Sequence, residues 1–332
     1  PKIYPEAESV SVFGGEELNP PQYGKVFITI KPFYGPFVPD SIKNNLKSIL
    51  RKYSVAGIIA EINDLKYLYV EVDVNAYYNP SLAPDANSVK TVVTNNITSY
   101  ADSADMNKYG AKFKYSKFQG IIDNSHDSIT SNITKVEIRR DMQPKMNQVA
   151  EYELCFGNPF YVKNKNGYNI KSSGFTIFGI PNTVYLGDIP NDDERTGKLF
   201  FFRLQGTNSP VIVSQNVGTI DYERAEVLLN PVNITGTSKK VQDVPIIEVS
   251  ACPQSNDVIG LQDLYLQLDV NNSTVDMVSD TITSGDNSSG TLYTATSSYI
   301  EGNITRTSEE ESLNTTLTSS DTYIIGSTST TY

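Results

Sequence analysis

The stretch that most constrains the fold is a rigid lead-in, residues 14–25, that runs directly into a strand. Its Gly14-Gly15 pair permits positive φ, and its Pro20-Pro21 pair fixes φ and offers no amide donor, so the segment is irregular. Apolar and polar side chains then alternate over residues 26–31, and Pro32 ends the run. The elements that follow can be interpreted as those needed to cover this strand.

Helix-like and strand-like patterns alternate up to residue 143. One-sided apolar stripes predict helices, and period-two alternation predicts strands. The predicted order is β-α-β-α-α-β, which indicates a small α/β sandwich with helices on one sheet face. The expected elements are a strand over 26–31, a helix N-capped by Asp40, an extended piece within 54–62, a strand over 66–78, a helix opening at Asp85 or Asn87, a short helix capped by Ser116 and a strand over 133–140.

The same stripes predict which side chains form the core of this sandwich. Alternation along strands and helical spacing along helices each place the apolar groups on one face. The side chains expected to be mostly buried are Ile28, Ile30, Leu46, Ile49, Val70, Val72, Val93, Ile97, Ile121 and Ile138.

Beyond Pro144 the pattern changes to short extended runs separated by Gly, Asn and Pro. This composition predicts an all-β domain, either a sandwich or an open barrel. Residues 198–203 are its most buried strand candidate, and Leu186-Gly187-Asp188 is one of several turn signals. The expected strands are 152–156, 175–178, 198–204, 211–214, 226–230, 246–250 and 264–270.

From Thr281 onward nearly half of the residues are Ser or Thr, and acidic side chains outnumber basic ones. The segment has little apolar area to bury, which favours disorder, yet residues 291–300 and 322–325 carry strand-forming side chains. We expect an arm that becomes ordered by contact with a sheet edge elsewhere. The predicted fold class is therefore α+β. Its parts are a lead-in arm (1–24), an α/β dimerisation-type domain (25–143), a β-rich domain (144–275) and a Ser/Thr-rich, strand-forming C-terminal arm (276–332).

Composition narrows the functional classes. The formal net charge of −11 disfavours nucleic acid as a partner. The sequence contains no long apolar run, so it predicts no transmembrane helix, and it shows no N-terminal secretion signal. Because the first residue is Pro1, we expect the chain to be a fragment or processed product that lacks an upstream half.

Two residue types that dominate enzyme sites are scarce. Cys155 and Cys252 form no Cys-x-x-Cys pair, so we interpret them as buried thiols of a reduced protein, with a disulfide between them as the alternative. The single histidine, His126, lies in a polar loop without a recognisable catalytic partner.

Carboxylate clusters are the remaining candidates for chemistry. Glu71 and Asp73 share a strand face, and further acidic groups occur in 192–194 and 263–269. Solvated surface is the commoner role of such groups, and no calcium-type loop is present. Gly14-Gly15 lacks the strand-before, helix-after context of a phosphate-binding loop. The sequence predicts no catalytic, cofactor-binding or metal-ligating residue, and no cofactor.

Several segments together resemble a known family. The chain is similar to the C-terminal half of a baseplate wedge protein from large contractile-tailed bacteriophages, in the baseplate J-like group. The resemblance is specific over residues 4–141 and general over 150–270, and residues 281–332 show no match. The segments that carry it are residues 4–17, residues 20–32, the helix from Asp40, the strand ending Asp73-Val74-Asn75-Ala76-Tyr77-Tyr78, the short helix after Ser116, and Val136-Glu137-Ile138-Arg139-Arg140.

The resemblance implies a structural role without catalysis. Copies would pair as homodimers and tie neighbouring wedges into a closed six-fold ring around the central hub. Other wedge proteins would be partners, while nucleic acid and membrane would not. The expected location is the virion tail baseplate, assembled in the bacterial host cytoplasm. The 21 tyrosines also favour association in general.

Two alternatives come from other functional classes. The β-rich domain and the Ser/Thr-rich arm could form a module that binds a glycan on the host surface. Paired carboxylates could instead hydrolyse cell-wall glycan, although no carboxylate pair lies in a recognisable motif. A glycan array would discriminate the first alternative, and a turbidity-clearing assay the second.

Overall fold

The computed structural model describes residues 3–17, 21–35, 38–55, 57–83, 85–162, 169–205, 209–241, 243–261, 264–280, 299–300 and 303–304. Within these residues the protein is mostly β, with 52% of residues in strands and 15% helical. The expected α+β class with a leading α/β sandwich is therefore wrong. The sandwich does not form because the predicted strands of the first half divide between two separate sheets, and one of these sheets recruits strands from the second half.

The first sheet is small and has the order β1-β2-β3. It comprises β1 (Ala7–Gly14), β2 (Lys25–Pro32) and β3 (Ile59–Asn63), with a 3-10 turn η1 (Gly15–Glu17) after β1 and a helix α1 (Asp40–Leu50) between β2 and β3. β1 pairs antiparallel with β2, whereas β2 and β3 are parallel neighbours joined through α1. We call residues 3–63 the N-terminal unit. Its core consists of Ile30, Val38, Leu46 and Ile62.

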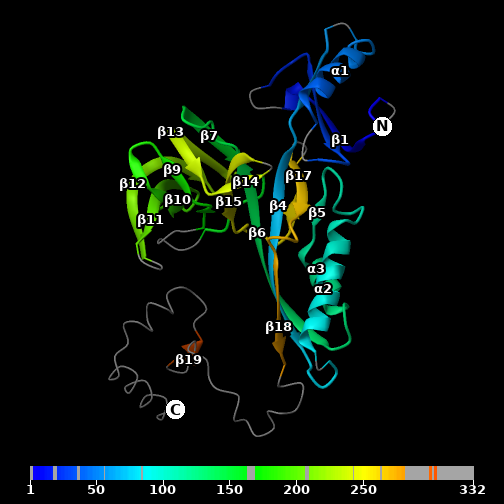
Figure 1. Cartoon of the computed structure of the whole chain (residues 1–332), viewed down its shortest axis with the longest axis vertical. Helices are drawn as coiled ribbons and strands as arrows, with labels where there is room; N and C mark the ends of the chain where they lie inside the picture. Colours follow the sequence, from blue (N-terminus) through cyan, green and yellow to red (C-terminus); the bar gives the residue numbers. More distant parts are fainter. Residues whose placement is uncertain are drawn as a thin grey trace.

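The second sheet has seven strands and forms the centre of the molecule. Its strands are β4 (Lys66–Tyr78), β6 (Ile129–Met142), β8 (Lys171–Ser172), β14 (Lys239–Val241), β15 (Val244–Ala251), β17 (Leu264–Leu268) and β18 (Thr274–Ser279). β4 pairs antiparallel with β6, and β17 and β18 both return from the end of the described body to pair parallel with β4. Figure 1 shows β4, β6 and β18 extending together away from the N-terminal unit.

Two helices, α2 (Ala86–Ala101) and α3 (Tyr115–Asp123), lie along one side of β4 and β6 in Figure 1. Every second residue of β4 faces them, which is why the inward side chains from Leu68 to Ala76 are at most 2% exposed. Asp85 caps α2 by accepting the backbone N–H groups of Asn87 and Ser88. A two-residue strand between the helices in sequence, β5 (Lys112–Phe113), pairs antiparallel with β16 (Val258–Ile259).

The third sheet closes into a five-stranded barrel. Its strands are β9 (Phe175–Ile177), β10 (Ile180–Pro190), β11 (Thr196–Gln205), β12 (Ser209–Asp221) and β13 (Glu226–Thr237). Each strand pairs with the next along the chain, and β13 closes the ring by also pairing with β9. A further strand, β7 (Val149–Cys155), pairs with the outer part of β13.

One predicted turn is a strand interior. Leu186-Gly187-Asp188 lies within β10, where Gly187 stands opposite Phe200. A Cβ on Gly187 would lie 2.7 Å from Cζ of Phe200, so the glycine makes room for the ring. Asp188 is only 1% exposed, and its carboxylate accepts the Ile170 N–H at 2.7 Å and the Tyr222 hydroxyl at 2.6 Å. Turn-type residues here satisfy packing and hydrogen bonding inside the barrel.

Two predicted helix caps are also wrong. Asp40 and Ser116 both lie inside their helices, and neither N-cap residue makes a side-chain cap hydrogen bond. In α3 the capping function comes from elsewhere, because the Asp257 carboxylate accepts the Tyr115 N–H at 2.9 Å. A distant acidic residue thus replaces the local cap that the sequence suggested.

The expected core of the first half is only partly correct. Ile28 on β2, Ile49 on α1 and Ile121 on α3 are only half-buried. The other expected core residues are buried, namely Ile30, Leu46, Val70, Val72, Val93, Ile97 and Ile138.

The Ser/Thr-rich arm falls mostly outside the described residues. Its described residues are 276–280, most of which belong to β18 of the central sheet, and the short strands β19 (Tyr299–Ile300) and β20 (Asn303–Ile304), which pair antiparallel with each other. The expected strand at 322–325 and most of that at 291–300 lie outside the described residues. The division into four domains stays a prediction. Among the described helices, none is long and apolar enough to cross a membrane.

Candidate assembly interface

Exposed apolar side chains concentrate in the N-terminal unit. Although the unit supplies only about a fifth of the described residues, it carries ten of their 25 exposed large hydrophobic side chains. Isolated exposed apolar groups are common, but clusters of them mark interaction surfaces. The ten are Ile3, Val10, Val12, Tyr23, Phe33, Tyr34, Tyr53, Val55, Ile58 and Ile59.

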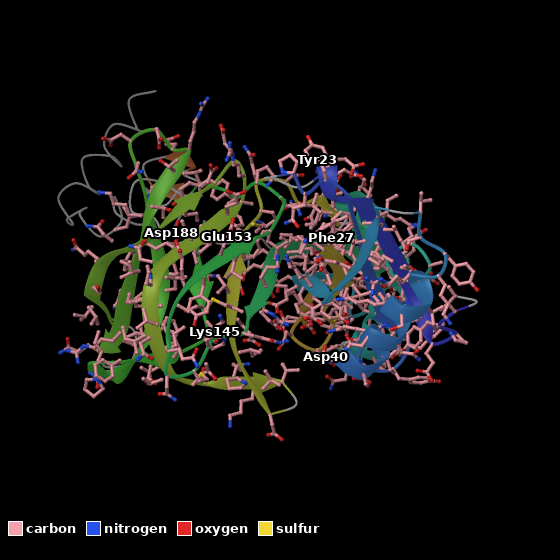
Figure 2. All side chains as sticks on the ribbon, turned by 90° about the horizontal axis from the view of Figure 1, so that it is seen from above. Tyr23, Phe27, Asp40, Lys145, Glu153 and Asp188 are labelled. Atoms are coloured by element: carbon pink, nitrogen blue, oxygen red, sulfur yellow. The ribbon has the colours of Figure 1, made fainter. Side chains whose placement is uncertain are left out.

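Part of this surface is built by two turns that meet at one end of the small sheet. Gly24 precedes β2 with φ +76°, Gly57 precedes β3 with φ +93°, and the Ile59 N–H donates to the Gly24 carbonyl at 2.9 Å. Positive φ is strained for other residues, so glycine is favoured at both turns. The geometry places Tyr23, 80% exposed, beside Ile59, 60% exposed. In Figure 2, Tyr23 lies at the upper margin of this unit.

A partly buried lysine joins the N-terminal unit to residues 66–280, which we call the body. Lys31 on β2 forms an ion pair with Glu8 on β1 at 2.8 Å and donates to Asn107 Oδ1 at 2.7 Å. Its ammonium lies 4.5 Å from the centre of the Tyr265 ring, which belongs to β17 of the central sheet. Burial, with a smaller contribution from Glu8, raises the pKa of nearby Tyr67 to about 12. We call this group, centred on Lys31, the lysine joint.

A buried arginine joins four elements of the central sheet. Arg139 on β6 has a side chain only 7% exposed and forms an ion pair with Glu71 on β4. Its guanidinium also lies 3.0 Å from Asp141 and 3.0 Å from Asp269, and 4.0 Å from Glu248 on β15. Because these carboxylates come from β4, β6, β15 and the turn after β17, one cation fixes four segments. We call this group the arginine joint.

Electrostatics in the arginine joint are dominated by burial. Desolvation raises the pKa of Glu71 and of Asp141 above their usual values, although Arg139 lowers both. The Arg139 guanidinium also lies 4.4 Å from the centre of the Tyr69 ring, whose pKa is likewise raised by burial. The joint carries more carboxylates than cations, and Lys239 adds a second positive charge 3.5 Å from Glu248.

The predicted carboxylate candidates are not assembled into one site. Glu71 belongs to the arginine joint, whereas Asp73 accepts the Thr274 hydroxyl at 2.5 Å and lies 3.9 Å from Lys135. Of the acidic run 263–269, Asp269 binds Arg139 and Asp263 lies outside the described residues. These carboxylates bind cations and hydroxyls of the same chain rather than converging on a shared open position.

The acidic run 192–194 and His126 form hydrogen bonds that stabilise turns. Asp193 accepts the N–H groups of Arg195 and Thr196 between β10 and β11, and hydrogen bonds from Thr196 lower its pKa. His126 precedes β6, and its Nδ1 lies 2.8 Å from Oγ of the buried Ser128. Both groups stabilise local chain reversals.

Cys155 and Cys252 are not joined by a disulfide, and both are half-buried rather than buried as expected. Cys155, Glu153 and Glu226 place their ligand atoms within 4.8 Å of one another, which is the one metal-like grouping among the described residues. Burial, with Glu153 next, raises the pKa of Cys155 to about 11, so the thiol is protonated at neutral pH. Metals bind the thiolate, and this environment therefore works against a metal site.

Sequence reasoning missed both joints. Arg139 and Lys31 each lie in a predicted strand, where their position gave no indication of a buried ion pair. One signal was available, because Glu71 and Arg139 occupy the polar positions of two alternating strands. Their contact nevertheless depends on the pairing of β4 with β6, which local sequence does not specify.

Comparison with known protein families gives two matches. Residues 1–63 match the family described as baseplate structural protein gp6, C-terminal domain I, and residues 66–141 match its C-terminal domain III. The first match coincides with the N-terminal unit, and the second covers β4, α2, α3 and β6 of the central sheet. No curated protein matches the chain. Residues 1–63 and 66–141 are thus similar to two domains of the baseplate structural protein gp6 family, which identifies the chain as a phage baseplate wedge protein.

Proposed function

We propose that the protein links neighbouring wedges into a closed ring around the central hub of the baseplate. The observation that carries this proposal is the match of residues 1–63 and 66–141 to C-terminal domains I and III of a baseplate structural protein. Copies of the chain pair as homodimers, six-fold repetition closes the ring, and other wedge proteins attach to it. The role is non-catalytic, and assembly takes place in the cytoplasm of the bacterial host.

The contacts of the described residues support a linking role. The lysine joint connects the N-terminal unit to the central sheet, and the arginine joint connects four segments of that sheet. The charged side chains in both joints are at most 20% exposed. Removing one partner of such a buried group is costly, so the parts move as a body. The N-terminal unit at one end keeps its apolar side chains available for contact.

The oligomeric state in solution tests the pairing of copies. Light scattering across a concentration series should give a dimer or larger assembly, since a stable interface buries at least about 1,000 Å². A double substitution, Tyr23→Ser with Ile59→Ser, removes two of the most exposed apolar groups of the N-terminal unit. A matched control, Phe178→Ser, removes an equally exposed apolar group on the barrel. A monomer at every concentration would contradict the proposal.

A further inference from the structure

β3 forms an open edge of the N-terminal unit. In the described part of the chain it pairs only with β2, so its other side has no strand partner. Such an edge presents backbone donors and acceptors to any extended segment that can approach it. Its first residue, Ile59, is 60% exposed, and the preceding Ile58 is 43% exposed. The edge thus offers both hydrogen bonds and apolar contact.

A basic stripe on α1 follows this edge. Lys43, Lys47 and Arg51 are spaced four residues apart, so they share one face of the helix. Lys43 identifies which face it is, because its ammonium binds Asp64, the residue that directly follows β3. β2 and β3 are parallel, so the helix between them runs antiparallel to both. The Arg51 end of the stripe therefore lies toward the start of β3, near Ile59.

The basic stripe lacks acidic partners at that end. Within the residues that the structure describes, Lys47, Arg51 and Lys52 form no ion pair, and all three are exposed. A segment that added to β3 would lie beside these cations. It should therefore be acidic and rich in strand-forming residues.

The chain contains such a segment beyond its described body. Glu309-Glu310-Glu311 is directly followed by 312–318, a run of Ser, Leu, Asn and Thr. Residues 281–332 as a whole include the acidic Asp286, Glu301, Glu309, Glu310, Glu311 and Asp321 against the single basic Arg306. The negative charge of this segment thus complements the cations beside β3, and Thr315, Thr316 and Thr318 are its strand-forming residues.

We propose that residues 309–318 of a second copy of this chain add a strand to the open edge of β3, with Glu309 and Glu311, which share one face of an extended strand, toward the cations of Lys47, Arg51 and Lys52. The proposal rests on the proposed function for the presence of a neighbouring copy. The described body ends after β18, at the far end of β4 from the N-terminal unit (Figure 1). A contact between opposite ends of two copies is heterologous, and heterologous contacts are the kind that close rings.

The reach of the arm permits such a contact. Residues 280–309 can span at most about 100 Å when extended. Backbone pairing would give the contact its direction, and Coulomb attraction would give it its selectivity. Exposed ion pairs contribute little individually, but several charges acting together should make the contact sensitive to salt.

Photo-crosslinking between isotopically distinguishable copies tests the contact. A benzophenone side chain replaces Leu313 in the full chain, and ¹⁵N-labelled and unlabelled copies are mixed before irradiation. Mass spectrometry should find adducts on residues 43–63 that join a labelled to an unlabelled copy. The substitutions K47E/R51E/K52E should lower the yield of these adducts about tenfold, and E309K/E310K/E311K added to them should restore it.

The control set is K112E/K145E/K198E, which reverses three exposed lysines without ion pairs elsewhere in the described residues. It should leave the adduct yield unchanged. Adducts elsewhere, adducts within single copies only, or an equal yield in the K47E/R51E/K52E variant would overturn the inference. Light scattering on the same samples separates the two proposals. Oligomers without the adduct reject only the strand addition, whereas monomers throughout reject the pairing of copies.

Discussion

The N-terminal unit and the body of the protein are stabilised by hydrophobic cores of different size. The unit covers its sheet with one helix and encloses a core of four buried residues, whereas the body combines the central sheet, two helices and the barrel in one continuous core. The unit also exposes far more apolar surface for its size. A region with a small core and an exposed apolar surface suits an attachment site, whereas a region with a large core suits a scaffold.

The two joints also differ in the number of charged groups that they contain and in the parts that they connect. The arginine joint lies within the body and gathers four carboxylates around one buried cation, whereas the lysine joint connects the unit to the body through a few polar groups. Breaking the first should disturb the scaffold, and breaking the second should release the unit. The following substitutions test this contrast, in order of decreasing expected effect.

The largest effect is expected for Arg139→Met. It leaves Glu71, Asp141 and Asp269 buried without their cation, which should lower the free energy of unfolding by about 3–5 kcal/mol. Urea denaturation measures the change. Arg195→Met is the control, because that side chain is 71% exposed and its loss should cost less than about 1 kcal/mol. Equal costs for the two variants would show that the arginine joint is not a structural centre.

Leu46→Ala should come next. Leu46 is 5% exposed in a core of only four buried residues, and its truncation should cost about 2–4 kcal/mol. Hydrogen exchange should show lost protection confined to residues 3–63. Tyr53→Ala, at a position 77% exposed in the same unit, serves as control. Protection lost to the same extent in β4 and β6 would contradict the separation of unit and body.

A smaller effect is expected for Lys31→Met. The substitution removes the ion pair with Glu8 and the hydrogen bond to Asn107, at a cost of about 1–3 kcal/mol. Limited proteolysis should cut faster between the unit and β4. Lys25→Met breaks the pair with Glu61, whose side chains are both 35% exposed, and should change stability by less than about 1 kcal/mol. Indistinguishable cleavage rates in the two variants would argue against the lysine joint.

The smallest expected effect is a pH dependence of the body. Burial raises the pKa of Glu71 and Asp141 in the folded state, so the folded protein holds these protons more tightly than the unfolded chain does. Their contribution to stability is therefore present below the unfolded values, 4.5 and 3.8, and is lost as pH rises through the raised folded values. Glu71→Gln should flatten this part of the stability–pH curve. A curve identical to that of the unchanged protein would reject the assignment.

Local sequence determined the elements whose patterns are self-contained. Alternation of apolar and polar residues predicts the strand at 66–78, and a one-sided apolar stripe predicts the helix at 40–50. In both cases the spacing of the apolar residues indicates which face is buried. The family was also evident from residues 4–141, whose segments match two baseplate domains. These features depend only on residues close to one another in the chain.

Tertiary structure decided how those elements combine. β4 pairs in parallel with β17 and β18, which come from the far end of the body. Because of this pairing, β4 belongs to the central sheet and not to the expected sandwich. Gly187 and Asp188 lie in a strand because Phe200 and Tyr222 provide their surroundings. Arg139 becomes a joint only when four segments converge on it. Backbone pairing and burial are completed by distant residues, so local patterns cannot specify them.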